Sequence, residues 1–312
     1  MIIKHNIPIY QICWLNFAEG GTVGTFYEPE NLQELIDLAR TLFLEKKSFD
    51  VIGHTSNIYF LPNYNAEIIV STRRLKNIIV GEKTVTAECG TGVKSLATQM
   101  VDSGIIGFEG LIDLPGTVAA SVYGNASCYN CSINKLLVSF DVLRPDGTIV
   151  TLFPDDLQLS KRSSSFKRGE QKGIILSVTL SCNKGNIEEL KMKAQLNHQI
   201  RISTQPPAQN NLGSIYRDVQ EWSLFGKLLN GIVGLLGFVY RLKCKDKGEL
   251  NKRKKALLLK LIGAEDIEPY LYNWNRYIWK DADAHRLFWK YHNRHQLLFK
   301  KSAFEIEIKG KR

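Results

Sequence analysis

The amino-acid sequence predicts an α+β protein with two mixed parts of strands and helices and a smaller, mostly helical third part. Three observations support this fold class. Short apolar runs interrupted by Gly, Pro and Asn dominate the chain before Asn183. Apolar residues at helical spacing dominate after it. Residues 303–309 then alternate apolar and polar side chains, which predicts a final strand.

The first part begins with a helix over 29–44, because Asn31 can cap it and Leu32, Leu35 and Ala39 share one helical face. Strands follow at 49–53, 58–61 and 66–71. The polar turn His54-Thr55-Ser56-Asn57 separates the first two of these strands.

The second part starts near Asn77 with two strands that pair around Gly81-Glu82-Lys83. A helix over 92–103 follows, and then a segment over 108–127 that is rich in Gly, Pro and small residues. Pro145-Asp146-Gly147 is a turn signal between two paired strands. The remaining predicted strands of this part are 78–80, 85–89, 135–144, 148–153 and 173–182.

The third part has apolar residues at helical spacing in five segments, before the strand at its end. These segments are 187–202, 224–240, 250–262, 267–277 and 281–299. We therefore divide the chain into subdomains over 1–75 and 76–185 and a C-terminal domain over 186–312.

The chain has 312 residues and a net charge of +10, which attracts anionic partners such as phosphorylated small molecules, membranes or nucleic acid. The basic run Lys252–Lys255 is short and no recognition motif accompanies it, so we expect no nucleic-acid partner.

A 13-residue stretch, Leu228 to Tyr240, is apolar except for Asn230, and a basic cluster follows it. Such a stretch is shorter than the roughly 20 residues of a spanning helix. Leu228 to Lys255 could make peripheral contact with an anionic membrane; the alternative is a core helix followed by a solvated basic helix.

Six scattered cysteines and a start without an apolar signal segment favour a cytoplasmic protein, with membrane association as an alternative. Cys128 and Cys131 form a C-x-x-C pair. A zinc site would need a second pair, and a redox dithiol would need a helix N-terminus, so we expect two small, half-buried loop residues and no metal site.

Two segments carry features of an anion site. The turn over 53–57 offers consecutive backbone N–H groups with Ser and Asn side chains. Gly110 to Ser121, followed by Gly124-Asn125-Ala126, has small residues that let the backbone approach a ligand closely. Together they could hold a long diphosphate from both sides.

In this order and separation, the two segments resemble the UDP-N-acetylenolpyruvoylglucosamine reductase (UDP-N-acetylmuramate dehydrogenase) family. The family patterns G-x-G-S-N, I-P-G-T-V-G-A and N-A-G-A-Y-G are similar to Gly53-His-Thr-Ser-Asn57, Leu114-Pro-Gly-Thr-Val-Ala-Ala120 and Asn125-Ala-Ser-Cys-Tyr-Asn130.

The resemblance implies a two-part FAD-binding PCMH-type fold, like that of vanillyl-alcohol oxidase, with a smaller helical domain on the substrate side. It also implies FAD as cofactor, NADPH as electron donor and an anionic nucleotide-sugar substrate of cell-wall or polysaccharide biosynthesis. The implied cofactor-binding residues are Gly53, His54, Thr55, Ser56, Asn57, Pro115, Gly116, Thr117, Val118, Ala119, Ala120, Asn125 and Ala126.

Three further motifs resemble the segments in which the family carries its catalytic residues. They are Lys161-Arg-Ser-Ser-Ser-Phe-Lys167, Gly213-Ser-Ile-Tyr-Arg217 and Glu305-Ile-Glu-Ile-Lys-Gly310. The resemblance implies that Arg162 stabilises the enolate formed during reduction, that Ser214 donates the proton and that Glu305 assists. A cation beside developing charge and a hydroxyl beside the adjacent carbon suit this chemistry.

The chain departs from the family pattern at four places. His54 and Thr55 replace part of G-x-G, Lys161 replaces a Tyr, and Arg217 replaces a Lys. The segment over 241–280 is basic and aromatic and does not resemble the family's substrate-lining segment. This favours related reduction chemistry on a changed substrate.

Two alternative functions remain. One is an FAD-dependent oxidase or dehydrogenase of a sugar or lipid-linked sugar at a membrane surface; consumption of NADPH separates it from the reductase. The other is a flavin-binding protein without catalysis, in which replacing Arg162, Ser214 and Glu305 would change nothing. His54 lies about one residue from a position where some related flavoproteins link FAD covalently, but a His that only hydrogen-bonds near phosphate is preferred.

Overall fold

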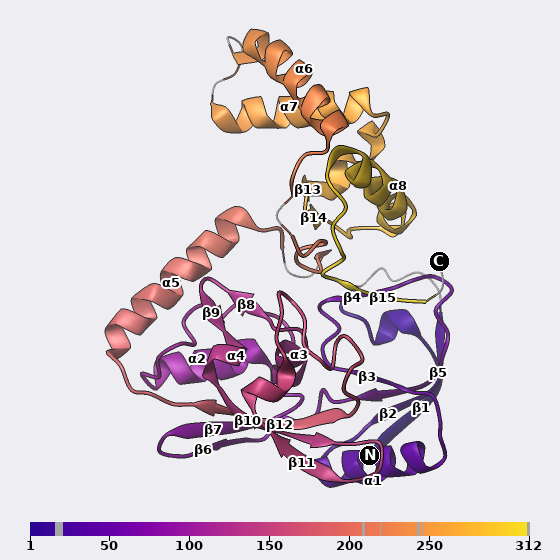
Figure 1. Cartoon of the computed structure of the whole chain (residues 1–312), viewed down its shortest axis with the longest axis vertical. Coiled ribbons are helices and arrows are strands. Elements are labelled where there is room, and N and C mark those ends of the chain that lie inside the picture. Colours follow the sequence, from indigo (N-terminus) through magenta and orange to yellow (C-terminus); the bar gives the residue numbers. More distant parts are fainter. Residues whose placement is uncertain (16–20, 208–209, 219, 242–243, 245, 311–312) are drawn as a thin grey trace. The chain divides into compact units, whose positions relative to one another are not determined.

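The computed structural model describes the chain except residues 16–20, 208–209, 219, 242–243, 245 and 311–312, and it also omits the side chains of residues 238–241. The chain forms two compact units (Figure 1). The first unit comprises Met1–Trp14, Gly20–Gln205 and Ile308–Arg312, and the second comprises Leu15–Glu19 and Pro206–Glu307. The three-part division with boundaries after 75 and 185 stays a prediction.

The first sheet of unit 1 has the strand order β1-β2-β5-β3. Its strands are β1 (Ile2–Pro8), β2 (Thr22–Glu28), β5 (Ala66–Ser71) and β3 (Asp50–Ile52). β1 and β2 are antiparallel, whereas β5 is parallel to both β2 and β3. The connection between β2 and β3 contains helix α1 (Leu32–Leu44), and Asn31 caps this helix as predicted by accepting a hydrogen bond from the Glu34 N–H.

The second sheet of unit 1 is antiparallel throughout, with the strand order β11-β10-β12-β7-β6. The turn between β10 and β11 has Gly147 in the left-handed region (φ 83°), and the Asp146 carboxylate accepts a hydrogen bond from the Thr148 N–H. The strands are β6 (Ile78–Val80), β7 (Thr84–Glu88), β10 (Leu137–Leu143), β11 (Ile149–Leu152) and β12 (Ile174–Ser181). The strands predicted for this part are therefore confirmed within a few residues.

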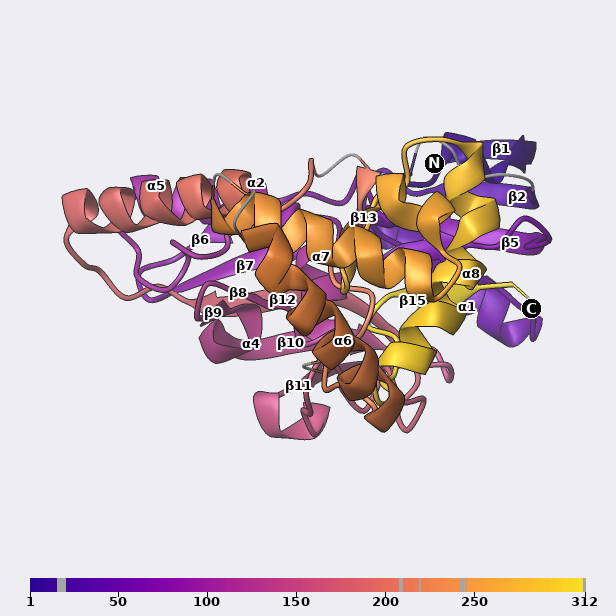
Figure 2. The same cartoon turned by 90° about the horizontal axis from the view of Figure 1, so that it is seen from above.

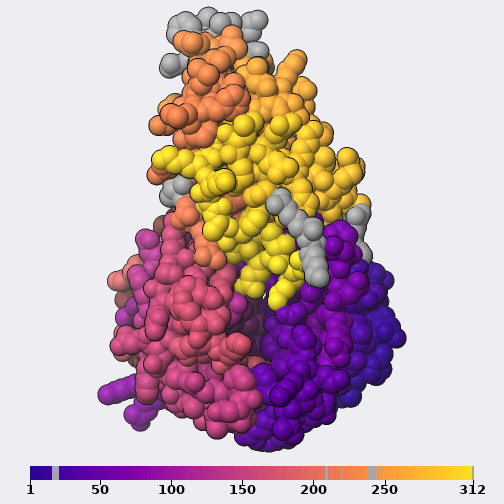
Figure 3. All heavy atoms as spheres, turned by 45° about the vertical axis from the view of Figure 1, so that its right-hand side comes forward, coloured from indigo at the N-terminus to yellow at the C-terminus, as the bar shows by residue number. Residues whose placement is uncertain are grey.

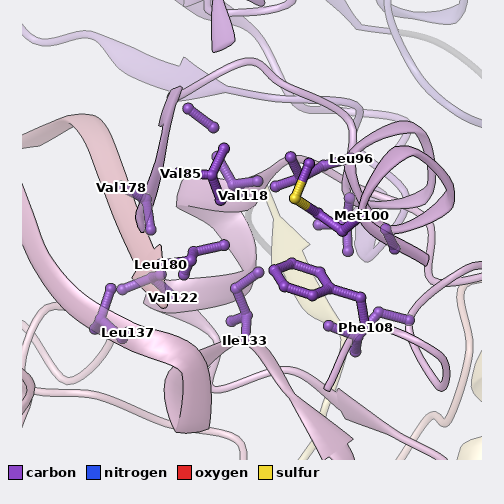
Figure 4. Packing of buried hydrophobic residues seen from close by; sticks show 14 of the residues in the cluster. Val85, Leu96, Met100, Phe108, Val118, Val122, Ile133, Leu137, Val178 and Leu180 are labelled. Carbon is purple, nitrogen blue, oxygen red and sulfur yellow. The ribbon is translucent and has the colours of Figure 1, made fainter. Parts of the chain in front are cut away.

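Helices α2 (Val93–Asp102), α3 (Val118–Tyr123) and α4 (Ile133–Leu136) cover one face of this second sheet (Figure 1). Figure 4 shows how their apolar side chains meet those of the strands around Phe108, which is fully buried. Burial of such side chains away from water supplies the main stabilisation of this unit. The same core holds the N-terminus of α3 in place, which matters for the site described below.

Helix α1 packs against strands of both sheets. Leu35, Ala39 and Leu42 are buried with Val70 of the first sheet and with residues of β10 and β12 in the second, including Leu176. The helix therefore joins the two sheets of unit 1 in one hydrophobic core. Helix α5 (Ile187–Thr204) also belongs to this unit, and Leu190 and Ala194 are its buried residues.

Unit 2 contains helices α6 (Leu224–Arg241), α7 (Lys247–Leu261) and α8 (Ala282–Leu298), as the sequence predicts. Figure 2 shows α6 and α7 side by side, in agreement with the extensive contacts between them. None of the helices within the described ranges is long and apolar enough to cross a membrane.

The helix predicted over 267–277 is wrong. A short 3₁₀ helix over Glu265–Tyr270 is followed by the strands β13 (Leu271–Asn273) and β14 (Arg276–Tyr277), which form a hairpin. Pro269 cannot continue an α-helix, and the aromatic residues after it suit strands.

The final strand is shorter than predicted over 303–309. Only β15 (Glu307–Lys309) is a strand, and it pairs with β4 (Ile58–Phe60). Phe304 forms an isolated bridge to Tyr216 instead. The alternating residues therefore pair with two different segments: Phe304 pairs with Tyr216, and β15 pairs with β4. The pairing changes where the chain passes from unit 2 back to unit 1.

The core of unit 2 is an aromatic stack around Tyr216. The His295 ring lies 3.9 Å from the Tyr216 ring, centroid to centroid, and Phe304 stacks on Tyr216 at 5.4 Å. The Tyr216 hydroxyl is hydrogen-bonded to Nδ1 of His292. His295 is fully buried, and neither of its ring nitrogens has a hydrogen-bond partner among the described residues. Burial, with a smaller effect from His292, lowers the pKa of His295 to about 3.

Because the folded pKa of His295 lies below the usual value, the unfolded chain binds a proton there first as the pH falls. The stability of unit 2 is therefore complete above pH ~6.5 and decreases below it, by about 2 kcal/mol at pH 5. We expect the variant His295→Phe, which keeps the stacked ring, to lose this acid sensitivity. Urea unfolding followed by tryptophan fluorescence at pH 8 and pH 5 measures it, since four of the five tryptophans lie in unit 2.

His5→Phe, at an exposed position in β1, is the matched control and should keep the acid sensitivity of the parent chain. If His295→Phe and the parent lost stability equally between pH 8 and pH 5, the buried imidazole would not be its cause.

Candidate functional site

The predicted anion-binding turn connects β3 to β4 in unit 1. The Ile58 N–H closes it by donating to the Thr55 carbonyl at 3.1 Å. Thr55 has a φ of 56°, in the left-handed region that a β-branched residue rarely adopts. This is the position at which the family pattern has a Gly, so Thr55 retains a glycine-like backbone at a steric cost.

The Thr55 hydroxyl stabilises this strained turn. Its Oγ1 accepts a hydrogen bond from the Trp14 N–H at 2.7 Å, and the residue is buried. The turn is thereby attached to the N-terminal segment of unit 1, and the hydrogen bond offsets part of the backbone strain.

Arg73 contacts this turn, and the sequence analysis did not identify it. Its guanidinium donates to the Gly53 carbonyl at 2.9 Å, to the Ile12 carbonyl, and weakly to Thr55 Oγ1 at 3.4 Å. These bonds connect the turn, through the Gly53 carbonyl, to the N-terminal segment at Ile12. The only sequence signal was its place directly after a buried strand, in Ser71-Thr72-Arg73-Arg74.

His54 is half-buried in the same turn. Burial, followed by the positive charges of Arg73 and Lys76, lowers the pKa of His54. The neutral imidazole is therefore the dominant form at neutral pH, and Arg73 is the stronger cation of this turn.

The second predicted segment lies directly against the first. A Cβ at Gly53 would lie 2.7 Å from Oγ1 of Thr117, and a Cβ at Gly116 would lie 3.2 Å from Oγ of Ser56. Gly116 also has a φ of 109°, which favours glycine. Thr117 is buried and caps α3 by accepting a hydrogen bond from the Ala120 N–H. The structure therefore brings together the two segments that the sequence indicated.

A third backbone strip, Cys89 to Gly92, contacts the first two segments. The sequence analysis did not identify it. The Val93 N–H donates to the Gly116 carbonyl at 3.0 Å, and the Val118 N–H donates to the Thr91 carbonyl at 2.9 Å. A Cβ at Gly92 would lie 3.4 Å from Cε1 of His54. Its signal was the Gly-Thr-Gly sequence between a strand and a helix.

These three strips pack with little side-chain volume between them. Such glycine-lined backbone suits the close approach of a diphosphate, and the N–H groups of successive tight turns suit its charge. The residues present therefore fit a dinucleotide cofactor whose phosphates lie along the backbone. Pro115 and Val118 to Ala120 belong to the same strip through the start of α3.

Asn125 and Arg162 belong to a neighbouring cluster in unit 1. Both residues are left-handed, with φ of 49° and 54°. The Asn125 amide donates to the Ser160 carbonyl at 2.8 Å, next to the two-residue turn that carries Arg162. The Arg162 guanidinium donates to the carbonyl and the hydroxyl of Ser127 at 3.1 and 2.9 Å. Asn125 therefore positions the turn that carries Arg162. Ala126 lies between Asn125 and Ser127 in the chain, so it connects the two residues that contact this turn.

The C-x-x-C pair lies in the hairpin next to this cluster. Cys128 and Cys131 are cross-strand partners in β8 (Ser127–Cys128) and β9 (Cys131–Ser132), and both are half-buried. Burial raises the pKa of Cys131. A raised pKa disfavours the reactive thiolate. The two residues lie in short strands rather than in the predicted loop.

Ser214 and Glu305 lie on two adjacent segments of unit 2. The Glu305 N–H donates to the Ile215 carbonyl at 2.7 Å, and the Arg217 N–H donates to the Ala303 carbonyl at 3.0 Å. These bonds flank the bridge between Tyr216 and Phe304. The structure therefore brings the segments of Ser214 and Glu305 together, although they lie 91 positions apart in the sequence (305 − 214).

Asn275 holds the segment that carries Ser214. Its side chain accepts from the Tyr216 N–H at 2.7 Å and donates to the Tyr216 carbonyl at 3.1 Å. Its carbonyl accepts from the Ile215 N–H at 3.0 Å. Asn275 lies in the turn between β13 and β14, within the segment that departs from the family pattern, so its role could not be inferred from the resemblance.

We expect Thr55→Val to destabilise unit 1 by about 2 kcal/mol, because the isosteric side chain keeps the strained backbone and removes the hydroxyl that accepts from the half-buried Trp14 N–H. Urea unfolding followed by circular dichroism measures the change. Thr55→Ser retains the hydroxyl and serves as the control. Equal stability of the Val and Ser variants would mean that the hydroxyl does not stabilise the turn.

Comparisons with known proteins agree with this geometry. Residues 25–152 match the family described as FAD binding domain. A UDP-N-acetylenolpyruvoylglucosamine reductase of Fervidobacterium nodosum is 29% identical over 225 residues, which cover 72% of each chain. That of Caldicellulosiruptor saccharolyticus is 27% identical over 269 residues, which cover 85% of this chain and 84% of the relative.

Among solved structures, UDP-N-acetylenolpyruvylglucosamine reductase from Thermus caldophilus superposes with a TM-score of 0.71 at 19% identity, covering 99% of this chain and 100% of that chain. This match establishes the fold, including that of the C-terminal part. In sequence and in fold, the chain is therefore similar to the UDP-N-acetylenolpyruvoylglucosamine reductases, and residues 25–152 match an FAD binding domain within a fold of the PCMH type.

Proposed function

We propose that the protein is an FAD-dependent oxidoreductase that uses NADPH to reduce an enolpyruvyl or related group on a nucleotide-linked sugar. The observation that carries this proposal is the contact between the turn at Gly53 and the strip at Gly116–Thr117, in a chain whose relatives are named as reductases of this kind. FAD, when bound and reduced by NADPH, would supply the hydride to the substrate.

In this proposal Gly53 to Asn57, the strip around Gly116, and the strip over 89–92 hold the diphosphate of FAD. Their backbones lie in direct contact, and Arg73 adds positive charge behind the first turn. The neutral His54 would lie beside the phosphates as a hydrogen-bonding group. A neutral imidazole can form such hydrogen bonds without a covalent link to the cofactor.

We further propose that Arg162 in unit 1, and Ser214 and Glu305 in unit 2, have the catalytic roles that the resemblance implies. Arg162 presents a guanidinium that Ser127 orients, which suits the charge that develops on a carboxylate during hydride addition. Ser214 would give the proton to the adjacent carbon, and Glu305 would orient that hydroxyl or restore its proton. The support for their shared role is the order of the three motifs and the pairing of the Ser214 and Glu305 segments.

Contact with a membrane surface through Leu228–Lys255 and a cytoplasmic location remain proposals. Lys243 and Lys245 of the predicted basic cluster lie outside the described residues. An oxidase or dehydrogenase of a lipid-linked sugar would use the same contact but would not consume NADPH.

The first experiment is the absorption spectrum of the purified protein before and after acid precipitation. We expect flavin bands that move to the supernatant, and bleaching of these bands by NADPH. Flavin that stays in the pellet would establish a covalent link and make His54 the first residue to replace. A colourless protein that FAD cannot reconstitute would contradict the proposal.

We expect Ser214→Ala to keep flavin binding and bleaching by NADPH, and to slow reoxidation by an enolpyruvyl UDP-sugar roughly 10²–10⁴-fold, because the proton donor is lost. Stopped-flow absorbance measures the two half-reactions separately. Ser203→Ala, at an exposed position on α5, is the matched control. Unchanged reoxidation in Ser214→Ala, Arg162→Ala and Glu305→Gln would favour a flavin-binding protein without catalysis.

We expect Asn275→Ala to lower kcat by roughly tenfold or more with little change in the flavin spectrum, because the Ser214 segment loses two bonds while the cofactor segments lie in unit 1. Asn251→Ala, on the exposed side of α7, should have no effect. Equal kcat in the two variants would mean that Asn275 does not position Ser214.

A further inference from the structure

Helix α6 packs against its own unit with its small residues. Gly226, Val233 and Gly237 are buried. A Cβ at Gly226 would lie 1.9 Å from the Leu298 carbonyl oxygen at the end of α8, and a Cβ at Gly237 would lie 2.4 Å from Cε of Lys254 on α7. Glycines at these two positions therefore let α6 approach its neighbours closely, and larger residues would clash.

Six bulky apolar residues of α6 are exposed and point away from these neighbours. Leu224 is 87% exposed, Leu228 is 63% exposed and Leu235 is 79% exposed. Phe225, Ile232 and Leu236 are exposed as well. At about 100° per residue, all six fall within one arc of roughly 120°, opposite Val233 and Gly237. A helix of a soluble core has the reverse arrangement, with its bulky apolar residues facing inward.

The charge of this hairpin is strongly positive. Residues 224–261 contain ten Lys and Arg and two Asp and Glu, a net charge of 10 − 2 = +8, against +10 for the whole chain. α6 itself contains no acidic residue. Lys227, Lys247 and Lys252 are exposed. Figure 3 shows atoms of this orange hairpin at the surface of the molecule.

We propose that the α6–α7 hairpin binds the surface of an anionic lipid bilayer. α6 lies in the plane of the interface, with Leu224, Leu228 and Leu235 inserted at the boundary of headgroups and acyl chains. The exposed Lys227, Lys247 and Lys252 contact the lipid phosphates. An amphipathic helix with large apolar residues on one face and basic residues around it is typical of such binding.

Charge selects this occupant over a second copy of the chain. Two copies that met through α6 would bring two surfaces of net charge +8 together, which costs free energy, whereas anionic headgroups neutralise them. The inference depends on α6 and α7 alone and holds whether or not the proposed reduction takes place.

The test is co-sedimentation of the full chain with vesicles of mixed phosphatidylglycerol and phosphatidylcholine, and with vesicles of phosphatidylcholine alone. We expect binding to the mixed vesicles that decreases with added salt. The double variant Leu228→Gln/Leu235→Gln should bind at least tenfold more weakly, because two exposed side chains lose their burial in the interface. Lys247→Gln and Lys252→Gln should each weaken binding about fivefold.

The matched controls carry the same changes at exposed positions of unit 1. Leu44 is 84% exposed at the end of α1, so Leu44→Gln should bind vesicles like the parent chain. Lys4→Gln and Lys83→Gln serve in the same way for charge. Far-ultraviolet circular dichroism of each variant in the absence of vesicles checks that the helices are retained.

Three outcomes would overturn the proposal. The parent chain could fail to bind the mixed vesicles. The Leu228→Gln/Leu235→Gln variant could bind them as well as the parent or as Leu44→Gln. The parent could also sediment as a dimer that this double variant dissociates, with no vesicle binding, which would identify a second copy of the chain as the occupant.

Discussion

The direct contact between backbone segments in unit 1 is the constraint on which the rest of the site depends. The turn after β3, the strip before α2 and the strip before α3 come from different places in the chain, and they meet at Gly53, Gly92 and Gly116. A side chain at any of these positions would separate the strips. Helices α2 and α3 start at this meeting place, and the core of the second sheet holds both helices there.

Thr55 shows that the turn can keep its backbone conformation with a residue other than glycine at this position. Its backbone stays in the left-handed region that a glycine would adopt freely, and the cost is offset by its hydroxyl and by the guanidinium of Arg73. The strain is of the kind often found at ligand-binding turns, where the surrounding structure holds a rare conformation in place. The turn therefore keeps its shape with different chemistry, and Arg73 adds a positive charge on its carbonyl side.

Unit 2 joins two motif segments with a segment that departs from the family pattern. Backbone hydrogen bonds pair the segments that carry Ser214 and Glu305. Asn275, from the segment that departs from the family pattern, supports that pairing through the backbone of Tyr216. The same segment supplies α7 and the packing partner of Gly237 on α6.

The sequence by itself determined the α+β class, most strands of the second sheet, the capped helix α1 and the two glycine-rich segments, because these depend on local periodicity, turn residues and caps. It did not reveal the strands β1 and β2. Most side chains of β1 are exposed, and β1 lacks a strict alternation of buried and exposed side chains. Only the tertiary structure showed that Arg73 and the strip over 89–92 contact the predicted segments and that Asn275 supports the segment of Ser214. Their contacts join residues distant in sequence, and a side chain that bonds to a remote backbone carbonyl leaves no local pattern. The outward direction of the exposed α6 leucines likewise depends on tertiary packing, because Gly226 and Gly237 place the opposite face of α6 against α8 and α7.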